Sequence, residues 1–111
     1  MAHTGLRTAR LLLLGTSLVA VLGGQAAPGG SVHRVAMKAV DYEPKRVAVR
    51  VGDAIEWTNE DVVAHTATQK GSFDVDVLPR RSGRTTMKTP GSFGYICRYH
   101  PNMRGEIVVA P

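Results

Sequence analysis

The sequence predicts an all-β protein, an antiparallel sandwich or barrel of about seven to eight short strands. Apolar residues recur at every second position rather than at helical spacing, as in Val47, Val49 and Val51. Turn signals such as Pro90-Gly91 separate the alternating segments. Beyond residue 26, no segment has the pattern of a long helix. These observations together favour strands joined by short turns over a helical fold.

Four strands are predicted in the first half of the fold, each with side chains alternating between two faces. The second strand ends at the turn signal Gly52-Asp53, and Ile55 and Trp57 share one face of the third strand. The loop 59–61 separates the third strand from the fourth. The four segments are residues 32–40, 47–51, 54–58 and 62–69.

Three more strands are predicted in the second half. Residues 73–77 lie between two turn signals, 70–72 and 78–79, and we predict a loop region there. In the strand that follows the turn at Pro90, side chains Phe93, Tyr95 and Cys97 share one face. The three segments are residues 84–88, 93–97 and 104–109.

Residues 1–26 are predicted to be a cleavable signal peptide and not part of the fold. Arg7 and Arg10 precede an apolar stretch at residues 11–22, and small residues around Ala26 fit a cleavage site. The apolar stretch is shorter than the roughly 20 residues that span a membrane. We therefore expect an exported protein, periplasmic in a bacterium, with one domain at residues 27–111 and no stable membrane insertion.

Charge and length restrict the partners of this domain. The chain of 111 residues has 14 Lys and Arg against 9 Asp and Glu. Loss of Arg7 and Arg10 with the signal peptide leaves 12 basic against 9 acidic residues, a net charge of +3. This modest charge and the predicted export argue against nucleic acid as a partner. Nothing in the sequence requires more than a monomer.

The chain has one cysteine, Cys97. Exported proteins usually use cysteines in pairs as disulfides, so a single cysteine is free, joined to another chain or bound to a metal. Cys97, His100 and Met103 follow one another at spacings of three residues, which suits a tight loop folded over one point. Thiolate, imidazole and thioether together favour copper over magnesium or calcium.

An electron-transfer copper site needs a second histidine beside this loop. His3 is lost with the signal peptide, and His33 lies near the start of the mature chain on a strand with no evident reason to approach the loop. His65 follows the loop after the Trp57 strand, where a sandwich brings end loops together. We therefore expect His65 to complete the site.

These segments resemble the plastocyanin/azurin family of blue copper proteins, the cupredoxins. The ligand loop, with Pro101 directly after His100, is most similar to that of amicyanin. The resemblance covers residues 32–109. It is carried by Tyr42-Glu43-Pro44, Val47-Ala48-Val49, Gly52-Asp53, Ile55-Glu56-Trp57-Thr58-Asn59 and His65-Thr66, and by Gly91-Ser92-Phe93-Gly94-Tyr95-Ile96-Cys97, His100, Met103, Gly105 and Ile107-Val108-Val109.

The resemblance implies a cupredoxin-like Greek-key β-sandwich with one type 1 copper ion at one end. It implies His65, Cys97 and His100 as strong ligands and Met103 as the weak axial ligand. The implied function is the shuttling of single electrons between transient redox partners, without enzymatic activity. Thr66 stands where many members of the family have Asn, and we expect its hydroxyl to tie the two ligand loops together.

Residues around the ligands suggest how a partner docks. His100 is expected to reach the surface through an apolar collar that includes Tyr99 and Pro101, and a backbone N–H near Thr66 is expected to donate to the Cys97 sulfur. Basic side chains near this end predict a partner with an acidic docking face. These side chains are Arg80, Arg81, Arg98 and Arg104.

Three other functions are compatible with parts of this pattern. A copper carrier or storage protein would use the same ligands without fast electron exchange. An enzyme could use Cys97 and His100 as nucleophile and base, but that chemistry has no role for Met103 and no third orienting residue is evident. Zinc is a weaker alternative, because a thioether is a poor zinc ligand.

Overall fold

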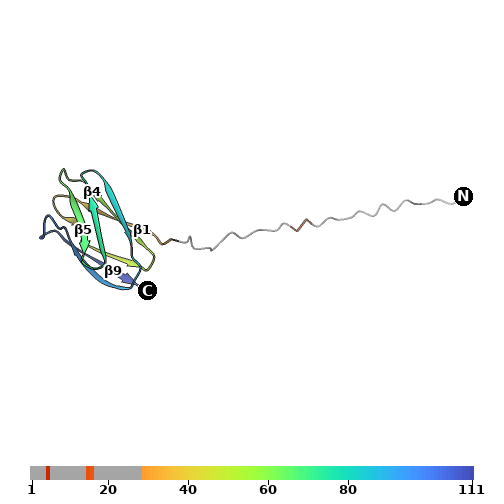
Figure 1. Ribbon diagram of the computed structural model, residues 1–111. Helices are drawn as coiled ribbons and strands as arrows, with labels where there is room; N and C mark the ends of the chain where they lie inside the picture. Colours follow the sequence, from red (N-terminus) through yellow and green to blue (C-terminus); the bar gives the residue numbers. More distant parts are fainter. Residues whose placement is uncertain (1–4, 6–14, 17–28) are drawn as a thin grey trace.

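Two β-sheets pack face to face in the computed structural model, which describes residues 5, 15–16 and 29–111 (Figure 1). One sheet has the strand order β2-β1-β4-β7, and the other has the order β3-β9-β8-β5-β6. This confirms the predicted all-β sandwich. The strands are β1 Val32–Met37, β2 Tyr42–Glu43, β3 Arg46–Arg50, β4 Ala54–Asn59, β5 His65–Gln69, β6 Phe73–Val77, β7 Ser82–Thr86, β8 Gly91–Ile96 and β9 Arg104–Ala110.

The predicted signal peptide, residues 1–26, lies outside the described residues except for positions 5, 15 and 16. Among the residues that the structure does describe, no helix has the length and apolar character needed to cross a membrane.

The strand pairing is mixed, whereas the sequence pattern predicted an antiparallel arrangement. β1 pairs with β4 and β3 pairs with β9 in parallel, whereas the other pairs are antiparallel. After the β1–β2 hairpin the chain crosses to the second sheet as β3 and returns as β4 beside β1. Because alternation along a strand is the same in both pairings, the sequence pattern could not distinguish them.

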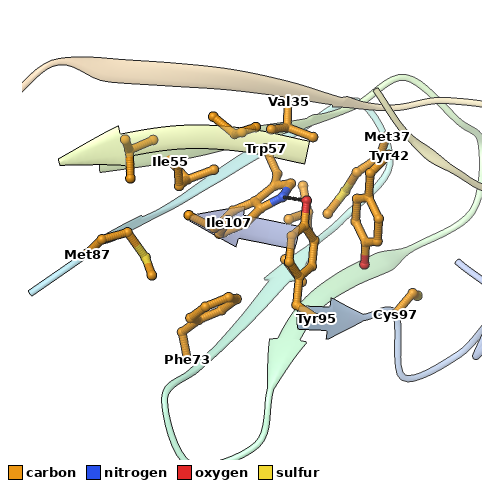
Figure 2. Packing of buried hydrophobic residues seen from close by; sticks show 14 of the residues in the cluster. Val35, Met37, Tyr42, Ile55, Trp57, Phe73, Met87, Tyr95, Cys97 and Ile107 are labelled. Carbon is orange, nitrogen blue, oxygen red and sulfur yellow. Dashed lines mark hydrogen bonds between the residues drawn. The ribbon is translucent and has the colours of Figure 1, made fainter. Parts of the chain in front are cut away.

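Aromatic side chains join the two sheets in the centre of the core. The Trp57 indole N–H of β4 donates to the Tyr95 hydroxyl of β8 over 3.2 Å, and their rings lie 5.5 Å apart at 73° (Figure 2). Tyr42 packs on the other side of Tyr95, with ring centroids 4.5 Å apart. Such aromatic pairs contribute about 0.5–1.5 kcal/mol each beyond the apolar area that they bury. Burial raises the pKa of Tyr95 to about 12, which keeps the hydroxyl protonated.

The segment 73–77, which we predicted to be a loop, is strand β6. Phe73 and Val77 are buried and Asp74 and Asp76 are exposed, which is the alternation expected of an edge strand with one face in the core. β6 pairs antiparallel with β5 in the register Ala67 to Val75. Turn signals on both sides obscured a strand that is only five residues long.

The predicted first strand ends at Met37 instead of residue 40, because residues 38–41 form a hairpin turn. Lys38 and Asp41 exchange backbone hydrogen bonds of 2.9 and 3.1 Å, and Ala39 and Val40 have φ values of 51° and 57°. A β-branched residue is unfavourable in this left-handed region. The carboxylate of Asp61 accepts both backbone N–H groups of the turn, at 2.8 and 2.9 Å, and so stabilises it.

The other predicted strands occur close to their expected positions. The fourth is shorter than predicted: it starts at His65, because residues 62–64 belong to the loop after β4, where Val62 is 79% exposed. The strand predicted at 84–88 lies two residues earlier, as β7.

Gly105 offers a test of the packing that holds the end of β8. Gly105 of β9 pairs with Tyr95, and a Cβ at this position would clash with the Tyr95 ring. We expect Gly105→Ala to lower the free energy of unfolding by about 1–3 kcal/mol, as overpacked cores do. Denaturant unfolding of the copper-free protein measures this.

Gly94→Ala is the matched control, because a Cβ on Gly94 of β8 meets no atom within 4 Å. We expect this variant to change stability by less than about 1 kcal/mol. Equal stabilities of the two variants would show that the Tyr95 ring can move away from the added methyl group without a loss in the free energy of unfolding.

Candidate metal centre

Cys97 follows directly after β8 and points into the sandwich. Tyr95 and Cys97 lie two positions apart, so they share the inward face, and Cys97 is fully buried (Figure 2). The Cys97 N–H donates to the Met103 carbonyl over 3.1 Å, and the Met103 N–H donates to the His100 carbonyl over 2.8 Å. These two bonds close the loop 97–103 into a compact turn between β8 and β9.

His65 is the first residue of β5, which lies beside β8 in the five-stranded sheet. The Thr68–Ile96 pairing brings the beginning of β5 to the end of the sheet that carries Cys97. His65 is fully buried there. His33 lies elsewhere, with its Nε2 atom 2.9 Å from the Asp53 carboxylate. His65, and not His33, is therefore the histidine that the fold brings to Cys97, as its place after the Trp57 strand predicted.

The three side chains His65, Cys97 and His100 converge on one point. Their ligand atoms all lie within 4.8 Å of one another. The Cys97 Sγ is 3.9 Å from Nδ1 of His65 and 3.6 Å from Nδ1 of His100, and the two imidazole rings meet edge to face with centroids 5.1 Å apart. Met103, at the end of the same loop, is 1% exposed.

Asp61 orients the ring of His65. Its carboxylate Oδ2 lies 2.7 Å from Nε2 of His65. A carboxylate can only accept, so Nε2 carries the proton and the lone pair of a neutral ring is on Nδ1, which faces the Cys97 sulfur. The hydrogen bond from the Val40 N–H lowers the pKa of Asp61, and the hydrogen bond from His65 lowers it further. The carboxyl group of Asp61 is therefore ionised at neutral pH.

Thr66 contacts the ligand loop in two ways. Its backbone N–H donates to the Cys97 sulfur over 3.3 Å, and its hydroxyl oxygen accepts the Arg98 N–H over 2.9 Å. The first contact joins β5 to the thiol itself, and the second joins it to the residue that follows. The Thr66 hydroxyl therefore joins β5 to the ligand loop.

His100 is the member of the group that solvent reaches. It is partly exposed, whereas His65 and Cys97 are fully buried. A shallow groove of about 390 Å³ beside it is lined by Val40 of the β1–β2 turn and by Tyr99 and Pro101. Val40 and Tyr99 are 43% and 53% exposed. The expected collar of Tyr99 and Pro101 therefore includes Val40, which local sequence did not reveal.

The donor set is soft and has no carboxylate oxygen directed at its centre. A thiolate and two imidazoles, with a thioether in the same loop, suit copper better than magnesium or calcium. Sequence reasoning missed Asp61. No signal in the sequence pointed to it, because a spacing of four residues has no meaning for contact outside a helix.

Both carboxylate oxygens of Asp61 accept hydrogen bonds, Oδ1 from Ala39 and Oδ2 from Val40 and His65. Asparagine has only one acceptor oxygen, so Asp61→Asn loses either the bond to the turn or the bond to His65. We therefore expect the ring of His65 to be held less firmly and metal binding to weaken. Loss of such an outer partner lowers metal affinity by about 10–100-fold. Competition against a Cu(I) chelator measures the change. Glu60→Gln, the same chemical change at an exposed neighbour, is the control, and equal affinities of the two variants would contradict the role of Asp61.

Comparison with known proteins places these observations in a family. The model of the cupredoxin-like domain matches residues 11–109. Amicyanin-alpha of Methylorubrum extorquens is 33% identical over 92 residues, which are 77% of this chain and 76% of that protein. Amicyanin of Paracoccus denitrificans is 28% identical over 95 residues, covering 77% of this chain and 69% of that protein.

Solved structures agree with this assignment. The Cu(I) form of a mutant of amicyanin matches with a TM-score of 0.64 and 27% identity, covering 78% of this chain and 87% of that one. Amicyanin from Paracoccus versutus matches with a TM-score of 0.63 and 25% identity, covering 78% and 86% of the two chains. With a family match over most of its length and the same sandwich architecture, this chain belongs to the cupredoxin-like family.

Proposed function

We propose that this protein is an exported one-electron carrier with a single type 1 copper ion held by His65, Cys97, His100 and Met103. The observation that carries the proposal is the convergence of one ring nitrogen from each of His65 and His100 and the buried Cys97 sulfur within 4.8 Å. Copper, when bound, supplies a Cu(I)/Cu(II) couple. The names of the relatives, amicyanins, support the same function.

The role of the chain is to hold these donors in one arrangement. His65 and Cys97 are buried at strand ends. His65 donates a hydrogen bond to Asp61, and Cys97 accepts one from the Thr66 N–H, and these bonds orient the two side chains. Two backbone hydrogen bonds hold the loop that supplies His100 and Met103. A donor set that stays in place in both oxidation states keeps rearrangement small during electron transfer. This suits an electron carrier, and we do not propose an enzymatic activity.

A redox partner is proposed to dock over His100. Its ring has solvent access and lies beside the exposed side chains of Val40 and Tyr99. A small apolar contact of this kind fits a transient complex that must dissociate quickly. Contact at His100 also gives the shortest path from the surface to the donor group, because the other members are buried.

We propose that the partner has an acidic docking face. Within the described residues, Asp41, Glu56, Asp74, Asp76 and Glu106 are all paired with Lys or Arg. Arg98 is held by two aspartates, so it adds little free positive charge. Arg80 and Arg81, in the loop after β6, have no ion pair among these residues, nor has Arg104, the residue after Met103. These three arginines would steer an acidic partner.

Export and oligomeric state complete the proposal. The signal peptide proposed at residues 1–26 would direct the domain 27–111 to the periplasm or another exported location. We propose a monomer there that does not bind nucleic acid and does not insert stably into the membrane. Transient complexes with redox proteins would then be its working associations.

Visible absorption tests the copper site. On addition of Cu(II) to residues 27–111 we expect an intense thiolate-to-copper band that disappears on reduction and is absent in Cys97→Ala. His33→Ala, which removes a histidine outside the donor group, should keep the band. Only the weak absorption of Cu(II) bound to nitrogen and oxygen would contradict the site. A slow self-exchange rate in a protein with the band would instead support copper carriage or storage.

Charge reversal tests the docking proposal. We expect the double variant Arg80→Glu, Arg81→Glu to be oxidised by the hexacyanoferrate(III) anion about tenfold more slowly at low ionic strength. High salt should remove most of the difference. Arg50→Glu is the control, because Arg50 pairs with Ala110 at the opposite end of the sandwich. Equal rates for both variants would contradict steering from the loop after β6.

A further inference from the structure

A chain of hydrogen bonds runs from a surface carboxylate to the backbone beside Cys97. The Thr68 hydroxyl lies 2.7 Å from Oδ1 of Asp74, and the Thr66 and Thr68 hydroxyls lie 2.8 Å apart. The Thr66 hydroxyl in turn lies 2.9 Å from the N–H of Arg98. Asp74 is on β6, the two threonines are on β5, and Arg98 follows Cys97 in the ligand loop.

The direction of every bond in this chain is determined. The ionised carboxylate of Asp74 can only accept, so Thr68 donates its one hydroxyl proton to Asp74. Thr68 therefore accepts from Thr66, whose own hydroxyl proton is used in that bond. The Thr66 oxygen is then left as an acceptor, which is what the N–H of Arg98 requires. The hydroxyl of Thr68 lowers the pKa of Asp74, and Arg98 lowers it further, so the carboxylate stays ionised.

Thr66 is the point at which this chain reaches the candidate metal centre. Its backbone N–H donates to the Cys97 sulfur, while its hydroxyl accepts from the residue after Cys97. Thr66 is fully buried. A hydrogen bond to a metal-binding thiolate withdraws charge from the sulfur and changes the redox potential of the metal. The position of Thr66 is therefore coupled to the electronic properties of the site.

The outer end of the chain lies at the surface. The Asp74 side chain is 55% exposed, and its Oδ1 also accepts from Nε of Arg98 over 3.1 Å. Thr68, Asp74 and Arg98 line an open groove of about 620 Å³ beside the β5–β6 turn. The hydrogen bonds around the thiol are thus connected, through two hydroxyls, to an ion pair that solvent can reach.

We propose that Thr68 and Asp74 are positioning residues that orient the Thr66 hydroxyl and thereby set the hydrogen bond to the Cys97 sulfur and the redox potential of the site. The inference rests on the proposed copper function. Neither residue touches the donor group, so both act through Thr66. In this protein a threonine serves where asparagine is common because Thr68 and Asp74 hold the Thr66 hydroxyl proton toward Thr68, which leaves the lone pairs of the oxygen directed at the Arg98 N–H.

Thr68→Val is the decisive variant, because valine has the shape of threonine but cannot relay the hydrogen bond. In the copper-free protein we expect the Arg98 amide to exchange with solvent at least about tenfold faster, as a local hydrogen bond is lost. In the copper-loaded protein we expect the ratio of Cu(I) to Cu(II) affinity to change by about tenfold, which is about 59 mV for a one-electron couple.

Two further variants distinguish the positioning role of Thr68 from a general effect on the stability of the protein. Thr68→Ser keeps the relay and should behave like the unmodified protein in both measurements. Thr58→Val removes a threonine hydroxyl that pairs with Ser82. Both of these residues are in the four-stranded sheet, away from Thr68, so this variant should leave the Arg98 amide exchange and the redox potential unchanged. The copper hyperfine splitting in the electron paramagnetic resonance spectrum should follow the potential.

The proposal is overturned if Thr68→Val leaves the potential and the hyperfine splitting unchanged, whether or not stability or the Arg98 amide is affected. Absence of the intense absorption band in the unmodified protein would refute the proposed function instead. In that case the exchange of the Arg98 amide in copper-free protein still decides the hydrogen-bond chain: protection unchanged by Thr68→Val overturns it, and loss of protection that Thr68→Ser restores supports it.

Discussion

Trp57 and Tyr95 meet across the two sheets, and the position of the metal centre depends on this contact. Tyr95 donates nothing to the site itself, but it lies two residues before Cys97 on β8 and its ring covers Gly105 at the start of β9. The ends of the ligand loop are therefore attached to two paired strands, and the Tyr95 ring packs against both of them. A loop of this length between fixed ends has few conformations, so packing in the core limits where its side chains can lie.

Asp61 and Thr66 each hydrogen-bond to more than one segment around the donors. Asp61 accepts from His65 and also from the two N–H groups of the left-handed turn at residues 39–40. Thr66 both donates to the thiol and accepts from the ligand loop. Within the described residues, no buried side-chain nitrogen or oxygen lacks a hydrogen-bond partner. Because buried polar groups without partners are costly, such shared acceptors hold several loops in place at once.

Errors in the predicted strands arose where local signals and tertiary contacts disagree. Turn residues on both sides suggested a loop at 73–77, but pairing with β5 makes this segment a strand. Apolar residues suggested strands through Val40 and from Val62, but both segments are loop residues near the site, held by Asp61 or exposed to solvent. Val40 belongs to the surface beside His100, and Val62 is exposed to solvent, so neither side chain is part of the core.

The sequence by itself predicted the fold class, the residues proposed as donors and their order along the chain. Alternation and turn residues are local properties, and three of the donors lie within seven residues, so no tertiary information was needed to recognise them. Only the tertiary structure decided which residues orient those donors. Asp61 reaches the turn at Val40, and Asp74 reaches Arg98 through Thr68 and Thr66. These contacts depend on strand register and sheet order, which the two-residue repeat of a strand leaves undetermined.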